Sequence, residues 1–541
     1  MDIKNNSRFA VITAITFFGL LASSLSAKAQ DIPVYIANKE VYLYLEELAS
    51  LHIIEVNSAV KPWSRMQVAK YLVLAEQKRD MLSVRQQKIL DFYLKDFGKE
   101  LHGDRNFKRR FDALYYKDTL FSITINPILG GTVFNNSNGT IYHRWNGAET
   151  YGYLGKSWGF YASLRDNHES ERISEDTYLT QQMGANYKIT GKGGDYSEMR
   201  GGITYSWSWG SIMVGKDHVV MGTAYNGSNI LSGRTPSFPL IRLRIKPVKW
   251  AELNYIHGWL VSEVIDSSRT TYFPGGQRDV FHPKYIAANL ITVTPVKDLD
   301  ISFGNSIVYS DQAPSPAYLA PLFFFKSVDH TLNGMNNNAG QNSQMFFDFS
   351  SHQIKYLHLY STLFLDEISL ERMFNKKEES NFYSIKAGSR LTNWPFMNVA
   401  LTVEYTRTHP LTFKHYEPTT TFESDKFNLG SYLTDNADEI FISLEVRPYR
   451  GLMLLGSYTK SRKGPDYSTL TTNRLGLPFM AYVVWQREAF TLSAQYQLQT
   501  DSFIFLEVCK SDIIDHSGGI YTPNYFLGNQ TTVSLGVNYG F

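Results

Sequence analysis

The end of the chain alternates apolar and small polar residues with a period of two. Val533, Leu535, Val537 and Tyr539 share one face, opposite Thr532, Ser534, Gly536 and Asn538. This alternation predicts a strand between lipid and an aqueous lumen. The same pattern recurs in residues 241–246, 301–309, 397–406, 440–447 and 491–499. Counting such runs from about Thr119 predicts roughly eighteen to twenty antiparallel strands, which is the size of a large bacterial barrel.

A different period dominates residues 30 to about 110. Apolar residues recur there at helical spacing, with charges between them: Val41, Leu45, Leu48; Met66, Ala69, Tyr71, Leu72, Leu74; Ile89, Leu90, Phe92, Tyr93 and Phe97. This spacing predicts amphipathic helices. Pro62 and Trp63 precede the second helix, and Ser64 is its expected N-cap. We expect a helical domain over residues 30–112, in the periplasm beside or inside the barrel mouth, and an all-β transmembrane barrel over residues 113–541.

The N-terminus has the features of a secretory signal. Lys4 and Arg8 precede an apolar run over residues 9–22, and Ala27-Lys28-Ala29 follows. This order predicts a signal peptide over residues 1–29, cleaved before Gln30. A membrane anchor is the alternative, but the run is shorter than the ~20 residues that a spanning helix needs.

Composition supports export to the outer membrane. Aromatic residues make up 14% of the 541 residues, while the mean hydropathy is only -0.26. Barrels combine both properties, because half of each strand faces the lumen and both interfaces carry aromatic girdles. We interpret Ile203, Tyr205, Trp207 and Trp209 as part of such a girdle.

The remaining composition narrows the class of protein. A single cysteine, Cys509, excludes a disulfide framework, and a net charge of +2 indicates no nucleic-acid partner. The strands of a soluble β-sandwich or β-propeller also alternate apolar and polar residues. The chain shows no repeat of fixed period, which argues against a propeller. The final Phe541 resembles the signal read by the barrel assembly machinery, which we expect as a partner together with outer-membrane lipid.

One strand carries the candidate ligand-binding residues. Arg242, Arg244 and Lys246 alternate with Ile241, Leu243 and Ile245, so the basic side chains face the lumen if the apolar set faces lipid. They either pair with carboxylates such as Glu252 and Glu445 in a structural ladder, or attract an anionic polysaccharide. Both interpretations stay open at this point.

No catalytic or cofactor motif accompanies this strand. The sequence contains no H-E-x-x-H motif. His352 and His358 on one strand would lie ~20 Å apart, too far to bind one metal ion. We therefore expect no enzyme, no metal and no cofactor. Three long segments without alternation, Ser310 to Asn342, Thr412 to Asp435 and Cys509 to Asn529, are expected to be external loops or plugs.

Several stretches together resemble the Wzi family of capsule assembly proteins, in its Bacteroidetes form. They are Val41–Leu48, Leu51–Ile54, Lys61–Arg65, Asn229–Ser232, Pro236–Pro239, and Asn436–Glu439 leading to Arg447-Pro448. The resemblance implies an eighteen-stranded barrel with a helical bundle at its periplasmic end, acting as a lectin that attaches capsular polysaccharide to the cell surface. Residues 51–74 also resemble a single S-layer homology repeat. A channel for small solutes is the alternative function, because barrels of this size can conduct unless plugged.

Overall fold

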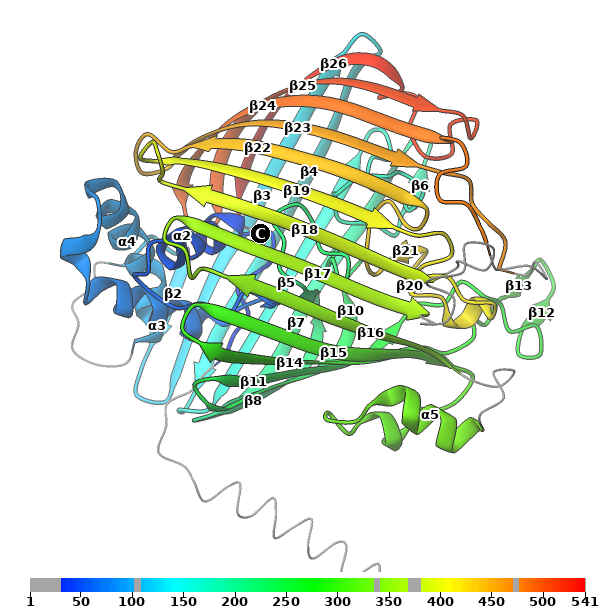
Figure 1. Cartoon of the computed structure of the whole chain (residues 1–541), viewed down its shortest axis with the longest axis horizontal. Helices are drawn as coiled ribbons and strands as arrows, with labels where there is room; N and C mark the ends of the chain where they lie inside the picture. Colours follow the sequence, from blue (N-terminus) through cyan, green and yellow to red (C-terminus); the bar gives the residue numbers. More distant parts are fainter. Residues whose placement is uncertain (1–30, 102–108, 335–340, 368–380, 470–475, 541) are drawn as a thin grey trace, which may run out of the picture.

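The computed structural model describes residues 31–101, 109–334, 341–367, 381–469 and 476–540. The predicted signal peptide and the terminal Phe541 lie outside these residues. Eighteen antiparallel strands close into a barrel (Figure 1), which confirms the predicted fold class. The last strand, β26 (Gly528–Tyr539), closes the barrel by pairing with the first, β3 (Phe121–Asn136).

The other wall strands follow in chain order: β4 (Gly139–Leu154), β5 (Trp158–Glu169), β7 (Gly193–Trp207), β8 (Gly210–Asp217), β10 (Phe238–Val248), β11 (Ala251–Leu260), β14 (Lys284–Val296), β15 (Leu299–Ser310), β16 (Asn342–Ser351), β17 (Leu357–Glu367), β18 (Phe382–Thr392), β19 (Val399–Thr408), β22 (Ala437–Val446), β23 (Leu452–Lys463), β24 (Trp485–Gln499) and β25 (Ser502–Asp515). Short strands β2 (Leu114–Lys117) and β6 (Lys188–Thr190) pair with β3 and β7.

The two ends of the barrel differ in the length of their connections. At one end, turns such as residues 155–157 and 208–209 join neighbouring strands. We call this the short-turn end. The other end, called the long-loop end, carries connections such as residues 218–237, 311–341 and 409–436. Outer-membrane barrels have short periplasmic turns and longer extracellular loops.

The predicted alternation sets the two faces of the wall. On β19, Leu401, Val403 and Tyr405 are exposed on the outer surface, whereas Thr402 and Glu404 are buried inside. On β7, Ile203 is exposed and Thr204 is buried. Tyr205 and Trp207 follow Ile203 on the outer face, and Trp209 in the next turn packs against Trp207 with ring centroids 5.2 Å apart. An outward aromatic cluster therefore lies at the short-turn end.

Three N-terminal helices pack around a common apolar core: α2 (Lys39–Ser50), α3 (Arg65–Glu76) and α4 (Val84–Phe97). Ser64 accepts a hydrogen bond from the Gln67 backbone N–H at 3.0 Å, as the predicted N-cap of α3. Ser83 and Gln86 form a capping box at the start of α4. Among the described residues, no helix has both the length and the apolar composition needed to cross a membrane.

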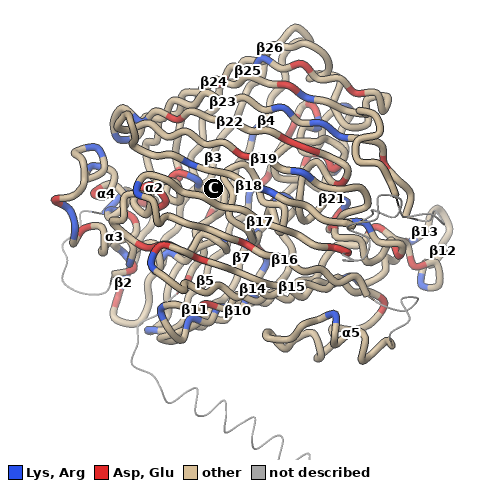
Figure 2. The backbone as a smooth tube through the Cα atoms, viewed as in Figure 1, with Lys and Arg blue, Asp and Glu red and all other residues tan. Residues whose placement is uncertain are grey.

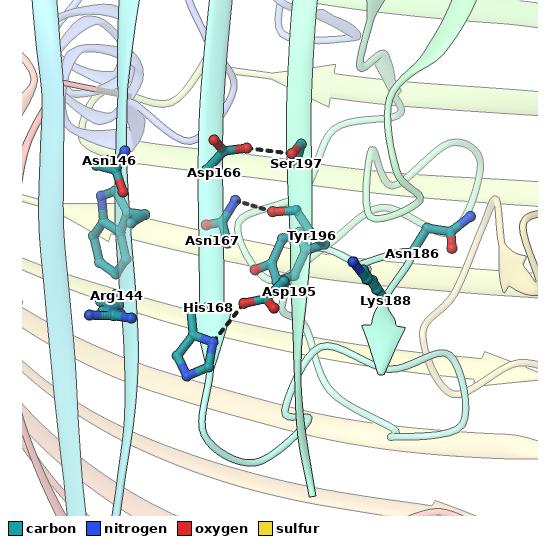
Figure 3. Close-up of a pocket in the computed structure, with 11 residues that line it drawn as sticks. Arg144, Asn146, Asp166, Asn167, His168, Asn186, Lys188, Asp195, Tyr196 and Ser197 are labelled. Carbon is teal, nitrogen blue, oxygen red and sulfur yellow. Dashed lines mark hydrogen bonds and ion pairs between the residues drawn. The ribbon is translucent and has the colours of Figure 1, made fainter. Parts of the chain in front are cut away.

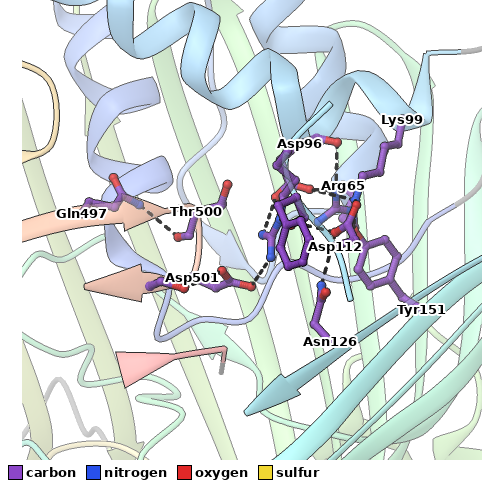
Figure 4. A network of polar contacts seen from close by, with 12 residues as sticks. Arg65, Asp96, Lys99, Asp112, Asn126, Tyr151, Gln497, Thr500 and Asp501 are labelled. Atoms are coloured by element: carbon purple, nitrogen blue, oxygen red, sulfur yellow. Dashed lines mark hydrogen bonds and ion pairs between the residues drawn. The ribbon is translucent and has the colours of Figure 1, made fainter. Parts of the chain in front are cut away.

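The helical domain is attached to the short-turn end of the barrel by buried polar contacts. The Tyr153 hydroxyl of β4 donates a hydrogen bond of 2.9 Å to Glu100 Oε1, and Glu100 is itself paired with Arg65 of α3 at 2.6 Å. Arg110 contacts Asp501, in the turn between β24 and β25, at 3.0 Å. Figure 4 shows Asp501 and this turn beside Asp96 of the helical domain. Because these groups are buried, each charge needs its partner.

Charges of both signs are spread over the helices and strands in the view of Figure 2, and do not gather by sign.

Two long-loop connections turn back into the lumen. Residues 218–237 carry β9 (Val220–Met221), which pairs with β1 (Val60–Lys61) of the helical domain. Residues 409–436, with β20 (Glu423–Ser424) and β21 (Phe427–Asn428), insert Phe413, Phe422 and Leu429 into the same core. Inward residues of many strands complete this core. The segment expected as an external loop or plug at Thr412 to Asp435 is therefore a plug.

The segment from Cys509 to Asn529 was wrongly expected to be irregular throughout. Strand β25 continues to Asp515 and β26 begins at Gly528, so only residues 516–527 form a loop. Cys509 and Ser511 on β25 pair in register with Thr532 and Gln530 on β26. The polar and charged residues of this stretch obscured its alternation in the sequence.

A third connection covers the outside of the wall. Residues 311–334 include α5 (Phe325–Asn333), which lies against the barrel wall near β15 (Figure 1). Phe325 and Tyr318 of this segment pack with outward residues Tyr255, Ile307 and Tyr309. Ile307 and Tyr309, which the alternation predicts to face lipid, are instead completely buried beneath the segment.

Candidate functional site

An open pocket of about 670 Å³ lies on β4, β5 and β7 (Figure 3). Charged, amide and aromatic residues line it: Arg144, Trp145, Asn146, Asp166, Asn167, His168, Asn186, Lys188, Asp195, Tyr196 and Ser197. We call it the wall pocket. It lies toward the long-loop end, because β5 ends at Glu169 and β7 begins at Gly193, on either side of a long connection.

Strand alternation directs a polar strip to the outer surface at this pocket. On β5, Leu164 is 48% exposed on the outer wall, and Asp166 and His168 follow at the same parity. Asp195 and Ser197 take the equivalent positions on β7, where they pair in register with His168 and Asp166. The outer face thus changes from apolar to polar as the strands approach the long-loop end.

The strip contains both hydrogen-bond donors and hydrogen-bond acceptors. His168 Nδ1 lies 2.6 Å from Asp195 Oδ1, and its Nε2 lies 3.3 Å from the hydroxyl of the exposed Tyr142. Ser197 donates a hydrogen bond to Asp166. Carbohydrates present hydroxyls that both donate and accept, and apolar ring faces that stack on aromatic side chains. The strip offers the hydrogen-bonding groups, and the exposed Tyr142 beside it offers an aromatic ring on the outer face. Trp145 and Tyr196 instead point into the lumen, where they contact Asn538 and Glu169.

Two cations of the wall pocket have open binding capacity. No hydrogen bond or ion pair joins the side chains of Arg144 or Lys188 to another residue in the described part of the chain. A guanidinium has five donors in a fixed fork that fits a carboxylate, and an ammonium has three. Arg144 and Lys188 can therefore bind an acidic sugar without first breaking an internal ion pair.

The basic residues singled out from the sequence lie elsewhere, on β10. Arg244 Nε contacts Glu252 Oε1 at 2.8 Å, and Lys246 Nζ lies 3.4 Å from Glu252 Oε2. This is the pairing with Glu252 that the ladder interpretation expects. Glu445, its other expected partner, instead contacts Arg390 at 3.1 Å and Arg447.

Arg242 differs from its two neighbours on β10. Within the described ranges its guanidinium has no hydrogen bond or ion pair. Ligand binding by Arg242, Arg244 and Lys246 remains a prediction.

The sequence analysis did not identify the wall pocket. Asp166 and His168 stand at positions where the alternation of their strand calls for apolar residues, and this interruption could have indicated a polar site on the outer face.

The expected separation of His352 and His358 is wrong. His352 follows the end of β16 and His358 lies near the start of β17, so a turn folds one histidine against the other. Their ring centroids are 3.8 Å apart, instead of the ~20 Å that one extended strand would impose. The expectation failed because the intervening residues were treated as strand.

Comparison with solved structures shows which known folds the chain is similar to. Wzi from Escherichia coli, an outer-membrane protein described as involved in group 1 capsule assembly and as a carbohydrate-binding β-barrel, aligns with a TM-score of 0.59 at 10% identity. The alignment covers 95% of this chain and 100% of Wzi. At this identity the likeness shows the fold alone.

Other outer-membrane barrels align less well. OprD from Pseudomonas aeruginosa gives a TM-score of 0.42 at 11% identity, covering 77% of this chain and 94% of OprD. OccAB2 from Acinetobacter baumannii gives 0.44 at 9%, covering 78% and 99%. No protein-family model and no curated protein sequence matches the chain. The closed barrel, whose fold is shared with the Wzi structure, indicates the outer membrane as its location.

Proposed function

We propose that the protein binds a surface polysaccharide on the outer face of the outer membrane and retains it there, without catalysing a reaction on it. The observation that carries this proposal is the wall pocket. It is open and polar, it lies toward the long-loop end, and it holds the unpaired cations Arg144 and Lys188. These cations favour an acidic polysaccharide, whose repeated charges add along the polymer.

Two further points support a capsule-related role. The long-loop end of an outer-membrane barrel faces the outside, so the wall pocket is accessible to a surface polymer, and the helical domain belongs in the periplasm. The Wzi structure shares the fold over almost the whole chain and is itself described as carbohydrate-binding. The sequence resemblance to the Wzi family points the same way.

A binding experiment tests the proposal directly. The purified protein in detergent is passed over immobilised acidic and neutral polysaccharides, at low and high salt. We expect salt-sensitive retention of the acidic polymer, and at least about tenfold weaker binding after the combined changes Arg144→Gln and Lys188→Gln. Lys70→Gln is the matched control, because Lys70 is an exposed lysine of helix α3, at the opposite end of the barrel. Equal binding by the double variant and the wild type would exclude the wall pocket.

The filled lumen argues against the channel alternative. Residues 218–237 and 409–436 pack an apolar core between the inward faces of the strands. We therefore propose that the barrel is closed. Reconstitution in a planar bilayer should give no steady current, and a stable open-pore conductance would favour the channel.

We propose the β10 cations, which line the lumen near the short-turn end, as a separate surface for an anionic polymer. Arg242→Gln should leave the thermal stability unchanged if this unpaired residue serves ligand binding, and should weaken polymer retention. Arg244→Gln, in contrast, removes the cation closest to the buried Glu252 carboxylate and should destabilise the barrel. Unchanged retention by Arg242→Gln would remove β10 from the binding surface.

A further inference from the structure

Three buried side chains with metal-binding atoms meet where the helical domain contacts the barrel wall. Glu46 comes from α2, whereas His352 and His358 come from the turn between β16 and β17 and from the start of β17. One ligand atom from each side chain lies within 4.8 Å of the other two. Their exposed fractions are 3%, 4% and 0%. In the described part of the chain, this is the group of histidine and acidic residues that is arranged to hold a metal ion.

Two of the facing atoms have no hydrogen-bond partner. Glu46 Oε2 and His352 Nε2 are both buried and unsatisfied, and they lie 3.5 Å from each other. Glu46 Oε2 is also 4.0 Å from His358 Nδ1. Ligand atoms on a tetrahedral Zn²⁺ with bonds of ~2.0–2.1 Å lie ~3.4 Å apart. The two imidazole rings are stacked, with an angle of 18° between their planes, so one ring must turn out of the stack for both nitrogens to point at one ion.

Neighbouring groups orient the three side chains. Ser58 donates a hydrogen bond of 2.5 Å to Glu46 Oε1, which leaves Oε2 for the centre of the group. Ser350 Oγ lies 2.9 Å from His358 Nε2, so Nδ1 is the nitrogen that faces Glu46. The Tyr225 hydroxyl lies 2.8 Å from the same Nδ1, and a metal ion would displace this contact. Partners on the second ring nitrogen are typical of metal-binding histidines.

One cation also lies near the site, because the Lys61 ammonium interacts electrostatically with the Glu46 carboxylate. The Lys61 ammonium competes with a metal ion for this carboxylate, so metal affinity depends on the two imidazole nitrogens as well.

We propose that Glu46, His352 and His358 bind a transition-metal dication, Zn²⁺ in particular, which fastens helix α2 to the barrel wall. Two imidazole nitrogens and one carboxylate oxygen form a donor set that suits Zn²⁺, whereas Ca²⁺ and Mg²⁺ prefer oxygen ligands alone. The site joins two parts of the chain about three hundred residues apart and is buried, so its role is structural. This role is separate from polysaccharide binding at the wall pocket.

The test uses the full chain, purified without a histidine tag, stripped with EDTA and titrated with ZnCl₂. We expect one tightly bound Zn²⁺ per chain by calorimetry and elemental analysis, and a higher unfolding temperature than in EDTA. MgCl₂ should have neither effect. His352→Gln and Glu46→Gln should each weaken Zn²⁺ binding by about tenfold or more and abolish the stabilisation. His257→Gln is the matched control, because His257 is also buried but contacts Tyr309 on the outer wall.

Several results would overturn the proposal. Absence of stoichiometric Zn²⁺ binding to the wild type would show that the group is an ordinary hydrogen-bonded histidine–glutamate cluster. Equal Zn²⁺ affinity of His352→Gln and the wild type would place the metal elsewhere. If the variants do not fold, Co²⁺ added to the wild type decides the question. Visible absorption of a four-coordinate Co²⁺ site supports the proposal, and the spectrum of hexaaqua Co²⁺ alone contradicts it.

Discussion

The plug formed by residues 218–237 depends on one buried carboxylate, and its charge can be removed with little change of shape. Glu404 on β19 accepts hydrogen bonds from the Tyr225 backbone N–H at 2.7 Å and from the Tyr360 hydroxyl at 2.6 Å. Its other oxygen lies 3.0 Å from Lys386 Nζ. The side chains of Glu404 and Lys386 are only 1% and 3% exposed. Glu404 thus holds the plug segment to the wall.

Glu404→Gln keeps an amide oxygen that can accept the two hydrogen bonds, but it removes the negative charge. Lys386 then stays buried without its counter-ion, and breaking a buried pair in this way costs about 3–5 kcal/mol. Lys386→Met should also destabilise the barrel, because it leaves the carboxylate unpaired. Combined in one chain, the two changes should be less destabilising than the sum of the single changes, since no isolated charge remains.

The free energy of unfolding is measurable by urea titration in detergent, with the heat-modifiable gel mobility of the folded barrel as the readout. Planar-bilayer recording of Glu404→Gln tests the same contact in another way, because a released plug segment should give transient openings. A change of less than about 0.5 kcal/mol for Glu404→Gln would refute the reasoning, as would a double variant that is less stable than the sum of the single effects predicts.

Three further perturbations follow from other parts of the structure. Arg65→Met leaves the buried Glu100 without its cation and removes one of the three cations around Asp96, so it should lower the free energy of unfolding by about 3–5 kcal/mol. Arg79→Met removes a largely exposed pair and should cost about 1 kcal/mol or less, and urea titration measures both changes. Burial, followed by the charge of Arg407, lowers the pKa of His409 from 6.5 to about 4. The free energy of unfolding therefore has its full value above pH 6.5 and falls by up to about 3 kcal/mol as the pH drops toward 4, because the unfolded chain takes up a proton that the folded one does not. His409→Phe should remove this pH dependence in urea titrations at several pH values. Phe325→Ala should loosen the segment on the outer wall by about 3–5 kcal/mol, so limited proteolysis should cleave near α5 while the barrel stays intact, and an unchanged cleavage pattern would argue against this packing.

The sequence predicts those features of the fold that depend on local periodicity. The alternation in strands such as β19 and β26 identifies the wall and its two faces, because every second side chain must match either lipid or lumen. The helical spacing in α2 and α4 identifies the N-terminal domain. Ser64 is recognisable as a cap, since a hydroxyl before an apolar helical run satisfies free backbone N–H groups.

The features that the sequence left unpredicted depend on contacts between distant residues. The alternation in the sequence shows that Ile307 and Tyr309 point outward. It does not show that the segment around Phe325 folds over them. His352 and His358 approach each other through a turn that carries no strong turn signal. Asp166 and His168 interrupt an alternating strand, yet only the register with β7 shows that they meet Asp195 and Ser197 in one pocket.

The attachment of the helical domain to the barrel has a consequence for biogenesis. The domain is synthesised first, but its partners Asp501, Arg447 and Asn398 belong to hairpins that are synthesised last. Its buried charges Arg110, Glu40 and Arg85 therefore lack these partners until the late hairpins are in place. Docking of the domain is therefore complete only after these hairpins have been made, so the domain takes its final position late in barrel assembly.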